Sequence, residues 1–207
     1  MHKRWLLLGA TLLMAVLAVA FVACGDDEDE EEEATPTTAE EIETPEATVG
    51  ETPEVAAPGA SAELRDVNGE VVGTATFVEE AGGVRITVEV SNLPPGEHGL
   101  HIHTVGQCSP DFAAAGGHFN PLDREHGLDN PNGPHAGDLP ILEVAEDGTG
   151  SQEIVNDIIT LSAGPTSLFD EDGSAVIVHA DPDDNVTDPT GNAGDRIACG
   201  PVEAAAP

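Results

Sequence analysis

The sequence contains very few aromatic residues and very few positive charges. It has no tyrosine, one tryptophan and five phenylalanines, and its six Lys and Arg stand against 40 Asp and Glu. From residue 61 onward, 26 acidic residues are opposed by four arginines and no lysine. A surface of this charge repels phosphate backbones and anionic lipid headgroups. Nucleic acid and anionic membrane surfaces are therefore excluded as expected partners.

Cysteine is also scarce, with only Cys24, Cys108 and Cys199 in the chain. Cys24 directly follows an N-terminal apolar segment and belongs with it. Cys108 and Cys199 remain as a pair, and outside the cytoplasm a disulfide is the default prediction for such a pair. The alternative is a pair of free thiols that join a metal site.

The first 23 residues have the layout of a bacterial export signal. Met1–Arg4 is basic, Trp5–Ala23 is largely apolar, and small residues lead into Cys24. This layout resembles a lipoprotein signal peptide, in which Cys24 becomes the lipid-bearing N-terminus that attaches the protein to a membrane. An uncleaved membrane anchor and plain secretion are the alternatives. All three predict an exported protein, in the periplasm or at the cell surface.

Residues 24–60 predict an extended linker. Asp26–Glu33 is an unbroken acidic run, and a stretch rich in Thr, Pro, Glu and Ala follows it. Such a segment buries too little apolar surface to fold, and its like charges keep it extended. We interpret it as a solvated spacer, with collection of cations as the alternative. The remaining residues, 61–207, are enough for one domain with a single core.

The domain has the periodicity of β-strands. Residues 84–90 alternate strictly between apolar and polar side chains, which is typical of a half-buried strand. Short apolar runs between turn residues predict strands at 62–65, 71–78, 84–90, 97–105, 141–144, 150–155 and 175–179. This pattern favours an antiparallel sandwich or barrel. Two long stretches rich in Gly, Pro, Asn and Asp, 106–139 and 180–197, predict functional loops.

Histidines gather in and around these two loops. Seven of the eight lie between His98 and His179. His101 and His103 are two residues apart on a predicted strand, so their side chains point the same way. Neutral imidazole is the commonest protein ligand for zinc and copper. The run of histidines therefore indicates a site for more than one metal ion.

Six segments closely resemble the copper/zinc superoxide dismutases in order and spacing: Gly96–His103, Gly116–Pro121, His126–Gly127, His135–Pro140, Val176–Ala180 and Gly191–Gly200. The resemblance covers essentially all of residues 61–207. It implies an all-β fold, a Greek-key, eight-stranded antiparallel β-barrel or sandwich with two long functional loops. It also implies conversion of superoxide to dioxygen and hydrogen peroxide by Cu(II)/Cu(I) cycling at a copper–zinc site.

The resemblance also assigns roles to individual residues. The copper ligands it implies are His101, His103, His118 and His179. The zinc ligands it implies are His118, His126, His135 and Asp138, so His118 bridges the two metals. Imidazole nitrogen suits both copper states, and zinc accepts three nitrogens and one carboxylate in a closed tetrahedron.

Five further residues match the family outside the metal ligands. Arg196 is implied to guide superoxide and to act with His118 in catalysis, because a guanidinium is a permanently charged anion-binding fork. Asp183 is implied to link a copper histidine to a zinc histidine. Cys108 and Cys199 match the family's disulfide, and His98 matches a structural histidine.

Two expectations complete the sequence analysis. The second loop contains Asp181, Asp183, Asp184, Asp188 and Asp195 but no lysine, which predicts slow, salt-sensitive capture of superoxide. The alternative function is a dismutase-like copper-binding or copper-delivery module without turnover. The sequence leaves the oligomeric state open, a homodimer included.

Overall fold

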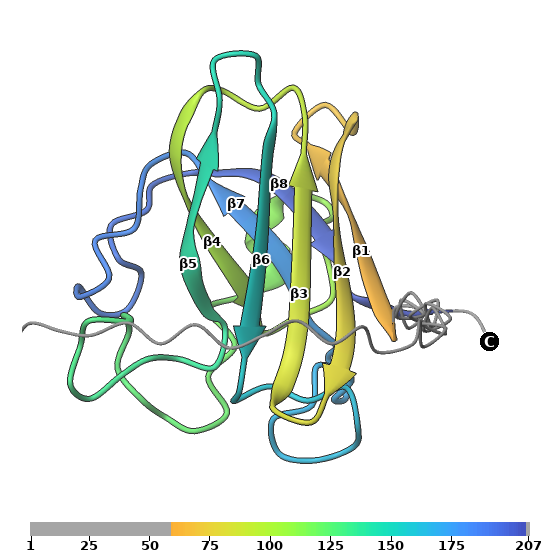
Figure 1. The fold of residues 1–207 in the computed structure, drawn as a ribbon, viewed down its shortest axis with the longest axis vertical. Helices are drawn as coiled ribbons and strands as arrows, with labels where there is room; N and C mark the ends of the chain where they lie inside the picture. Colours follow the sequence, from red (N-terminus) through yellow and green to blue (C-terminus); the bar gives the residue numbers. More distant parts are fainter. Residues whose placement is uncertain (1–58, 206–207) are drawn as a thin grey trace, which may run out of the picture. The chain divides into compact units, whose positions relative to one another are not determined.

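A computed structural model describes residues 59–205, in which antiparallel strands form a barrel (Figure 1). Predictions for the export signal, for Cys24 and for all but the last two residues of the linker lie outside this range. The strands are β1 (Ala60–Asp66), β2 (Val71–Glu80), β3 (Gly83–Val90), β4 (Gly96–His103), β5 (Asp138–Val144), β6 (Gly150–Asn156), β7 (Ala175–His179), β8 (Arg196–Pro201) and β9 (Glu203–Ala204).

The strands pair in the order β5-β4-β7-β8-β1-β2-β3-β6, with the two-residue β9 added to β1. All of these strand pairs are antiparallel. Strand β4 pairs with β7 rather than with its sequence neighbour β3, which is the crossing expected of a Greek key. Strands β5 and β6, at the two ends of the order, also lie against each other and nearly close the barrel. The predicted fold class is confirmed.

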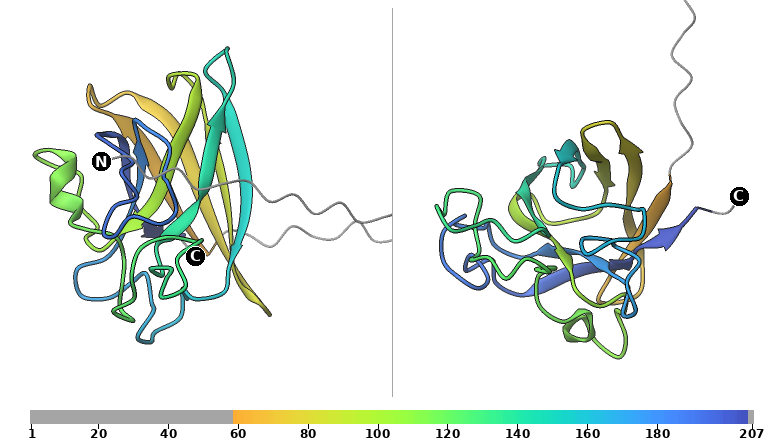
Figure 2. Two further views of the ribbon diagram at one scale, coloured as in Figure 1. Left: turned by 90° about the vertical axis from the view of Figure 1, so that its left-hand side faces the viewer. Right: turned by 90° about the horizontal axis from the view of Figure 1, so that it is seen from below.

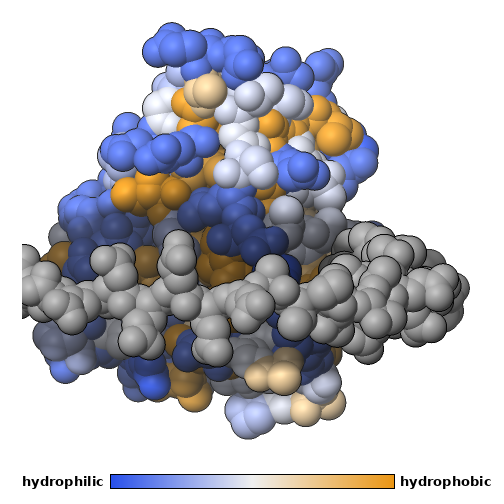
Figure 3. Space-filling view, viewed as in Figure 1, coloured by the Kyte–Doolittle hydropathy of each residue, from blue (hydrophilic) through white to orange (hydrophobic). Residues whose placement is uncertain are grey.

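Alternating side chains divide the strands between core and solvent as the sequence predicts. Ile86 and Val88 of β3 are fully buried in the barrel core. Arg85, the residue before Ile86, points outward and pairs with Glu80 and Glu153 at 2.7 and 2.6 Å. Such exposed ion pairs contribute little to stability. On the face shown in Figure 3, hydrophobic and hydrophilic residues are interspersed.

Strand β8 has no counterpart among the strands predicted from periodicity. Its sequence, Arg196–Pro201, has small residues where large apolar side chains would alternate with polar ones, and both of its edges are paired, to β7 and β1. A side chain at Gly200 would collide with the backbone of Glu63 on β1, so the close strand packing requires a small residue there. The sequence-based limit of the second loop at residue 197 is therefore two residues too late.

Helical structure is nearly absent, as the sequence predicts. Within residues 59–205, the structure contains one 3-10 helix, η1 (Phe112–Ala115), which lies in the first long loop. Asp111 caps η1 by accepting a hydrogen bond from the Ala113 N–H at 3.0 Å. None of the helices in this range is long and apolar enough to cross a membrane.

A disulfide joins the first long loop to the barrel. Cys108 and Cys199 are bonded, with Cα atoms 5.9 Å apart, which confirms the predicted pair and rules out the alternative of free thiols in a metal site. Cys199 lies on β8, three residues after Arg196, and Cys108 lies four residues before Phe112. The bond therefore fixes the loop segment whose backbone Arg196 contacts.

Replacing both cysteines, Cys108→Ser with Cys199→Ser, should lower the free energy of unfolding by about 4–5 kcal/mol. The disulfide spans 91 residues of sequence, and releasing a loop of that length returns entropy to the unfolded chain. Urea unfolding of metal-free protein, followed by circular dichroism, measures the change. An unchanged midpoint and slope would show that the crosslink contributes nothing.

Candidate metal centre

The metal centre lies on the outer face of β4, beneath the two long loops. Leu100 and Ile102 of β4 point into the barrel core, whereas His101 and His103 point to the other face. All four side chains are buried, at no more than 1% exposure. Both long loops, residues 106–137 and 180–195, extend from this side of the barrel (Figures 1 and 2). The loops thus supply the cover that keeps two histidines out of water.

Backbone hydrogen bonds fasten the first long loop onto β4. Phe119 N–H donates to Ile102 O at 2.8 Å, and Ile102 N–H donates to Gly137 O at 2.8 Å. A side chain at Gly137 would collide with Ile102 O, so this close approach requires glycine. The two contacts place His118 and Asp138, the neighbours of Phe119 and Gly137, beside the β4 histidines.

Three imidazole nitrogens converge on the Asp138 carboxylate. Asp138 Oδ1 lies 2.9 Å from His118 Nδ1, 3.1 Å from His126 Nδ1 and 3.3 Å from His135 Nδ1. His135 Nδ1 and His118 Nδ1 are themselves 3.4 Å apart. All four residues are buried. Three imidazole nitrogens and one carboxylate oxygen in a closed, dry pocket are the donor set that structural zinc prefers.

A second set consists of four histidines. Ligand atoms of His101, His103, His118 and His179 lie within 4.8 Å of one another. His103 Nε2 and His179 Nε2 are 3.4 Å apart, and neither His101 Nδ1 nor His118 Nε2 has a hydrogen-bond partner. A buried polar nitrogen without a partner is costly unless something else binds it. Four inward-facing imidazoles, two of them unpartnered, therefore fit a copper ion.

His118 belongs to both sets through its two ring nitrogens. Its Nδ1 lies with the Asp138 group, and its unpartnered Nε2 faces the four-histidine group. His101 is also within 4.8 Å of His118, His126 and Asp138. Because His101 Nε2 is hydrogen-bonded to Asp183, its remaining nitrogen, Nδ1, is the one left for the four-histidine group.

Hydrogen bonds to the outer nitrogens fix the orientation of the rings. His103 Nδ1–H donates to Gly116 O at 2.9 Å, and His179 Nδ1–H donates to Gly194 O at 3.1 Å. Each bond leaves Nε2 free as a ligand. His98 is buried between two carbonyls, with Nδ1 2.8 Å from His179 O and Nε2 2.8 Å from Pro94 O. His98 thus holds the end of β7 in place and contributes no ligand atom to either set.

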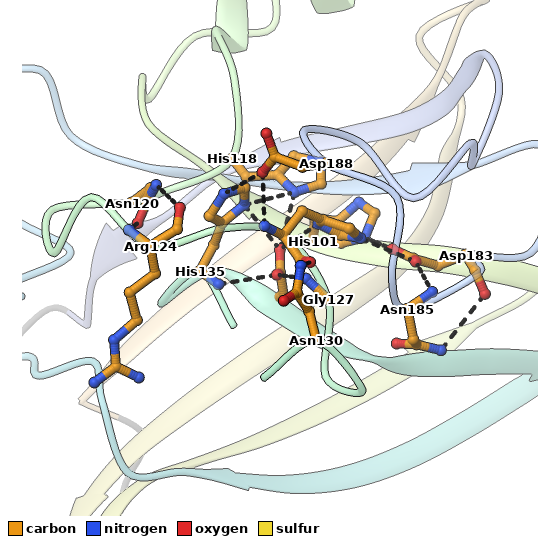
Figure 4. A network of polar contacts seen from close by, with 12 residues as sticks. His101, His118, Asn120, Arg124, Gly127, Asn130, His135, Asp183, Asn185 and Asp188 are labelled. Atoms are coloured by element: carbon orange, nitrogen blue, oxygen red, sulfur yellow. Dashed lines mark hydrogen bonds and ion pairs between the residues drawn. The ribbon is translucent and has the colours of Figure 1, made fainter. Parts of the chain in front are cut away.

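Asp183 joins the two sets as the sequence predicts. One of its oxygens accepts a hydrogen bond from His101 Nε2–H at 2.5 Å, and the other accepts from His126 Nε2–H at 3.0 Å (Figure 4). Asp183 is 5% exposed, unlike the other aspartates of the second loop. The exposed acidic surface of this loop is therefore made by Asp181, Asp184, Asp188 and Asp195.

Burial keeps three histidines of the four-histidine set neutral. It lowers the pKa of His103 to about 2, that of His179 to about 3 and that of His118 to about 4, so their lone pairs are available at neutral pH. Burial opposes ionisation of Asp138, but hydrogen bonds from three histidines hold its pKa well below the ordinary value.

His126 differs, because it contacts two carboxylates. Burial lowers its pKa, but the hydrogen bonds to Asp138 and Asp183 outweigh burial and raise the pKa to about 9. The metal-free protein therefore holds a proton at His126 at neutral pH, and a metal that binds Nδ1 must displace it.

A hollow of about 620 Å³ opens onto the four-histidine set. His103, His118 and His179 form part of its wall, with Arg196 beside them. The Arg196 guanidinium donates to Phe112 O and to Gly116 O, the latter at 2.6 Å, and is partly buried. Among the residues lining the hollow, Arg196 is the only one with a permanent charge. A small anion that enters the hollow therefore meets one fixed cation next to the histidines.

Asp188 contacts the site in a way that the sequence does not predict. Its carboxylate accepts a hydrogen bond from the His126 backbone N–H at 2.7 Å and lies 3.7 Å from His135 Nε2. In sequence it is one aspartate of an acidic loop, nine residues from the nearest histidine, and no local pattern separates it from its neighbours.

Comparison with known proteins agrees with this geometry. Residues 71–202 match the family model for copper/zinc superoxide dismutase (SODC). Superoxide dismutase [Cu-Zn] 1 of Aquifex aeolicus is 47% identical over 145 residues, which cover 69% of this chain and 86% of that protein. The superoxide dismutase-like protein YojM of Bacillus subtilis is 44% identical over 152 residues, which cover 71% of this chain and 77% of YojM.

A solved structure is similar as well. The crystal structure of a SOD-like protein from Bacillus subtilis matches with a TM-score of 0.67 and 43% identity, over 70% of this chain and 99% of that one. The chain belongs to the copper/zinc superoxide dismutase family. Its two buried donor sets fit the copper and zinc of that family.

Replacing Gly191 by alanine should disrupt the Asp183–His126 contact. Gly191 has φ +59°, and an added Cβ would overlap Asp183 Oδ1 and lie 2.5 Å from His126 Nε2. We expect Gly191→Ala to weaken zinc binding about 10-fold, the lower end of the range for losing a ligand's hydrogen-bond partner. Gly164→Ala is the matched control, because its Cβ would meet nothing within 4 Å. Equal zinc affinities of the two variants, in chelator competition, would contradict the prediction.

Proposed function

We propose that this protein is an active superoxide dismutase. Two superoxide anions and two protons would yield one dioxygen and one hydrogen peroxide, with one superoxide oxidised and the other reduced. The observation that carries the proposal is the pair of unpartnered buried nitrogens, His101 Nδ1 and His118 Nε2, together with a hollow that His118 and Arg196 both line. A redox metal at those nitrogens would be reached by a small anion through this hollow.

The residues divide between the two metals as the family resemblance implies. His101, His103, His118 and His179 would hold copper, and His118, His126, His135 and Asp138 would hold zinc. Copper, when bound, supplies one-electron cycling between Cu(II) and Cu(I), and zinc has no redox chemistry. Asp183 keeps His101 and His126 in fixed orientations by accepting from both Nε2–H groups.

Arg196 and His118 would handle the substrate and the proton. The Arg196 guanidinium is held by two backbone carbonyls, which fixes its position beside the histidines of the hollow. It would attract superoxide and orient it by charge-assisted hydrogen bonds. His118 Nε2 has no protein partner, so it can hold a proton there and return it to the peroxide that is being formed.

Export and attachment to a membrane through Cys24 form part of the same proposal. The apolar segment before Cys24 supports export, and a disulfide is the cysteine state that an oxidising compartment favours. Mass spectrometry of the mature N-terminus from a bacterial host tests it, and an unmodified or uncleaved N-terminus would contradict it.

The second candidate is a copper-binding or copper-delivery module without turnover. Similarity to the superoxide dismutase-like protein YojM keeps this candidate in view, since that name describes likeness and states no activity. The presence of Arg196 and of the complete donor set around Asp138 favours the enzyme. A metal-loaded protein that fails to remove superoxide would favour the module.

The substitution His118→Ala should abolish superoxide removal and reduce the bound metal below one copper and one zinc per chain. His118 is the only residue with a nitrogen in each donor set, so its loss opens both sites. Elemental analysis and a superoxide-scavenging assay on the full chain measure both effects. Two metals with unchanged scavenging in the variant would contradict the assignment.

Capture of superoxide should not slow down as salt is added. Asp181, Asp184 and Asp195 are exposed on the second loop, and they repel an approaching anion over a distance that shrinks from about 30 Å at 0.01 M to about 8 Å at 0.15 M salt. We expect the rate of superoxide decay, measured after pulse radiolysis, to rise over this range, because salt weakens the repulsion. The double variant Asp181→Asn/Asp195→Asn should be faster at low salt. A rate that falls with salt would show that the loop attracts superoxide.

A further inference from the structure

His118, His126, His135 and Asp138 form the proposed zinc set. In each of the three histidines, the outer nitrogen, Nε2, is the one that points away from Asp138, and these nitrogens have different partners. His118 Nε2 faces the four-histidine set, and His126 Nε2–H donates to Asp183. His135 Nδ1 points at Asp138 and His118, so its Nε2 must carry the proton whenever Nδ1 acts as a ligand. A ligating histidine almost always donates this outer N–H to a carboxylate, a carbonyl or a water.

The carboxylate nearest to that nitrogen belongs to Asp188. Asp188 Oδ1 lies 3.7 Å from His135 Nε2, longer than a hydrogen bond but within the range of an ion pair (Figure 4). The same oxygen accepts the His126 backbone N–H at 2.7 Å, which fixes it relative to the zinc-set residues. The His135 side chain is 6% exposed, whereas that of Asp188 is 49% exposed. Asp188 therefore closes the solvent side of the zinc set.

We propose that Asp188 is a positioning residue for zinc: it accepts the outer N–H of His135 and anchors the His126 segment with the same carboxylate. This inference rests on the proposed zinc site and extends it to a residue outside the ligand set. In this proposal Asp188 accepts the Nε2–H of His135, as Asp183 accepts the Nε2–H of His126. Carboxylates of the second loop then orient two of the three zinc histidines. The negative charge also makes the His135 ring a better donor.

This arrangement couples the two long loops at a second point. Pro189 and Thr190, the residues after Asp188, line the hollow together with His135. Asn185 O, earlier in the same loop, accepts a hydrogen bond from Asp129 N–H of the first loop. The Asp188 carboxylate thus links His135 to a residue adjacent to the wall of the hollow.

Two substitutions separate the effects of the Asp188 carboxylate. Asp188→Asn keeps an oxygen that can accept the His126 N–H but removes the charge, whereas Asp188→Ala removes both. We expect zinc affinity to fall in the order wild type, Asp188→Asn, Asp188→Ala, with a loss of about 10- to 100-fold in the alanine variant. Zn²⁺ alone is added below one equivalent to the metal-free full chain, in competition with a chromophoric chelator.

Asp184→Asn is the matched control. Asp184 belongs to the same exposed loop and stabilises it by accepting hydrogen bonds from Val186 N–H, Thr187 N–H and Asn192. Within residues 59–205 its carboxylate makes no hydrogen bond or ion pair with a histidine. This control should keep zinc affinity within about 3-fold of wild type, because it leaves the outer nitrogens of the ligands untouched. An equal loss in Asp184→Asn and Asp188→Asn would overturn the proposal, because general loop order or charge would then explain both.

A second measurement reports on the His135 ring itself. In long-range ¹H–¹⁵N spectra of the zinc-loaded wild type, the His135 Nε2–H proton should exchange slowly with water, and in Asp188→Asn and Asp188→Ala it should exchange faster. An unchanged His135 proton in both variants would overturn the proposal. If Asp188→Ala fails to fold, Asp188→Asn still tests the proposed role of Asp188. If the wild type itself binds no zinc, the proposed metal site fails; if it binds zinc and only the variants show no effect, the role of Asp188 fails alone.

Discussion

The metal centre depends on a strand that is buried on both faces. One face of β4 packs into the barrel core, and the other face carries His101 and His103 at no more than 1% exposure. A barrel strand ordinarily turns its second face to water. Here the hydrogen bonds of Phe119 and Gly137 to Ile102 fasten a long loop over that face. Without them, the histidines would be solvated and the donor atoms would not converge.

Covering the histidines has a free-energy cost, and binding of a metal removes this cost. Burial keeps His103, His118 and His179 neutral, and two ring nitrogens are left without any partner. Each such nitrogen has given up water without gaining a hydrogen bond. A metal that binds these atoms therefore stabilises the covered state relative to one in which the loops have lifted. Folding of the loops and metal binding are in this way parts of one equilibrium.

The sequence predicts the strands and the ligands for different reasons. Strict alternation at residues 84–90 identifies β3, because one face is buried and the other is wet. Strand β8 has no such alternation, since its small residues are selected by the close approach of neighbouring strands. The seven proposed ligands were found through motifs whose spacing matches the family, and the structure brings all seven together.

The contacts of Asp188 could not be predicted in the same way. The family resemblance implies the role of Asp183, which is buried between His101 and His126, but no local pattern marks Asp188, which is half exposed beside His135. Both positions result from how residues 180–195 fold back over the first loop, which depends on contacts such as Asp129 N–H to Asn185 O. Local sequence patterns do not predict such long-range pairing.

Electrostatic forces act on a substrate anion at two ranges in this protein. The exposed aspartates repel it at a distance, through water and salt that weaken the repulsion. Inside the hollow the nearest fixed charge is Arg196, partly buried and held by two carbonyls, where screening is weaker. Asp138 and Asp183 are also close, but their charges are directed to the histidines that donate to them. We therefore expect repulsion to govern how often the anion arrives, and Arg196 to govern how it is held once inside.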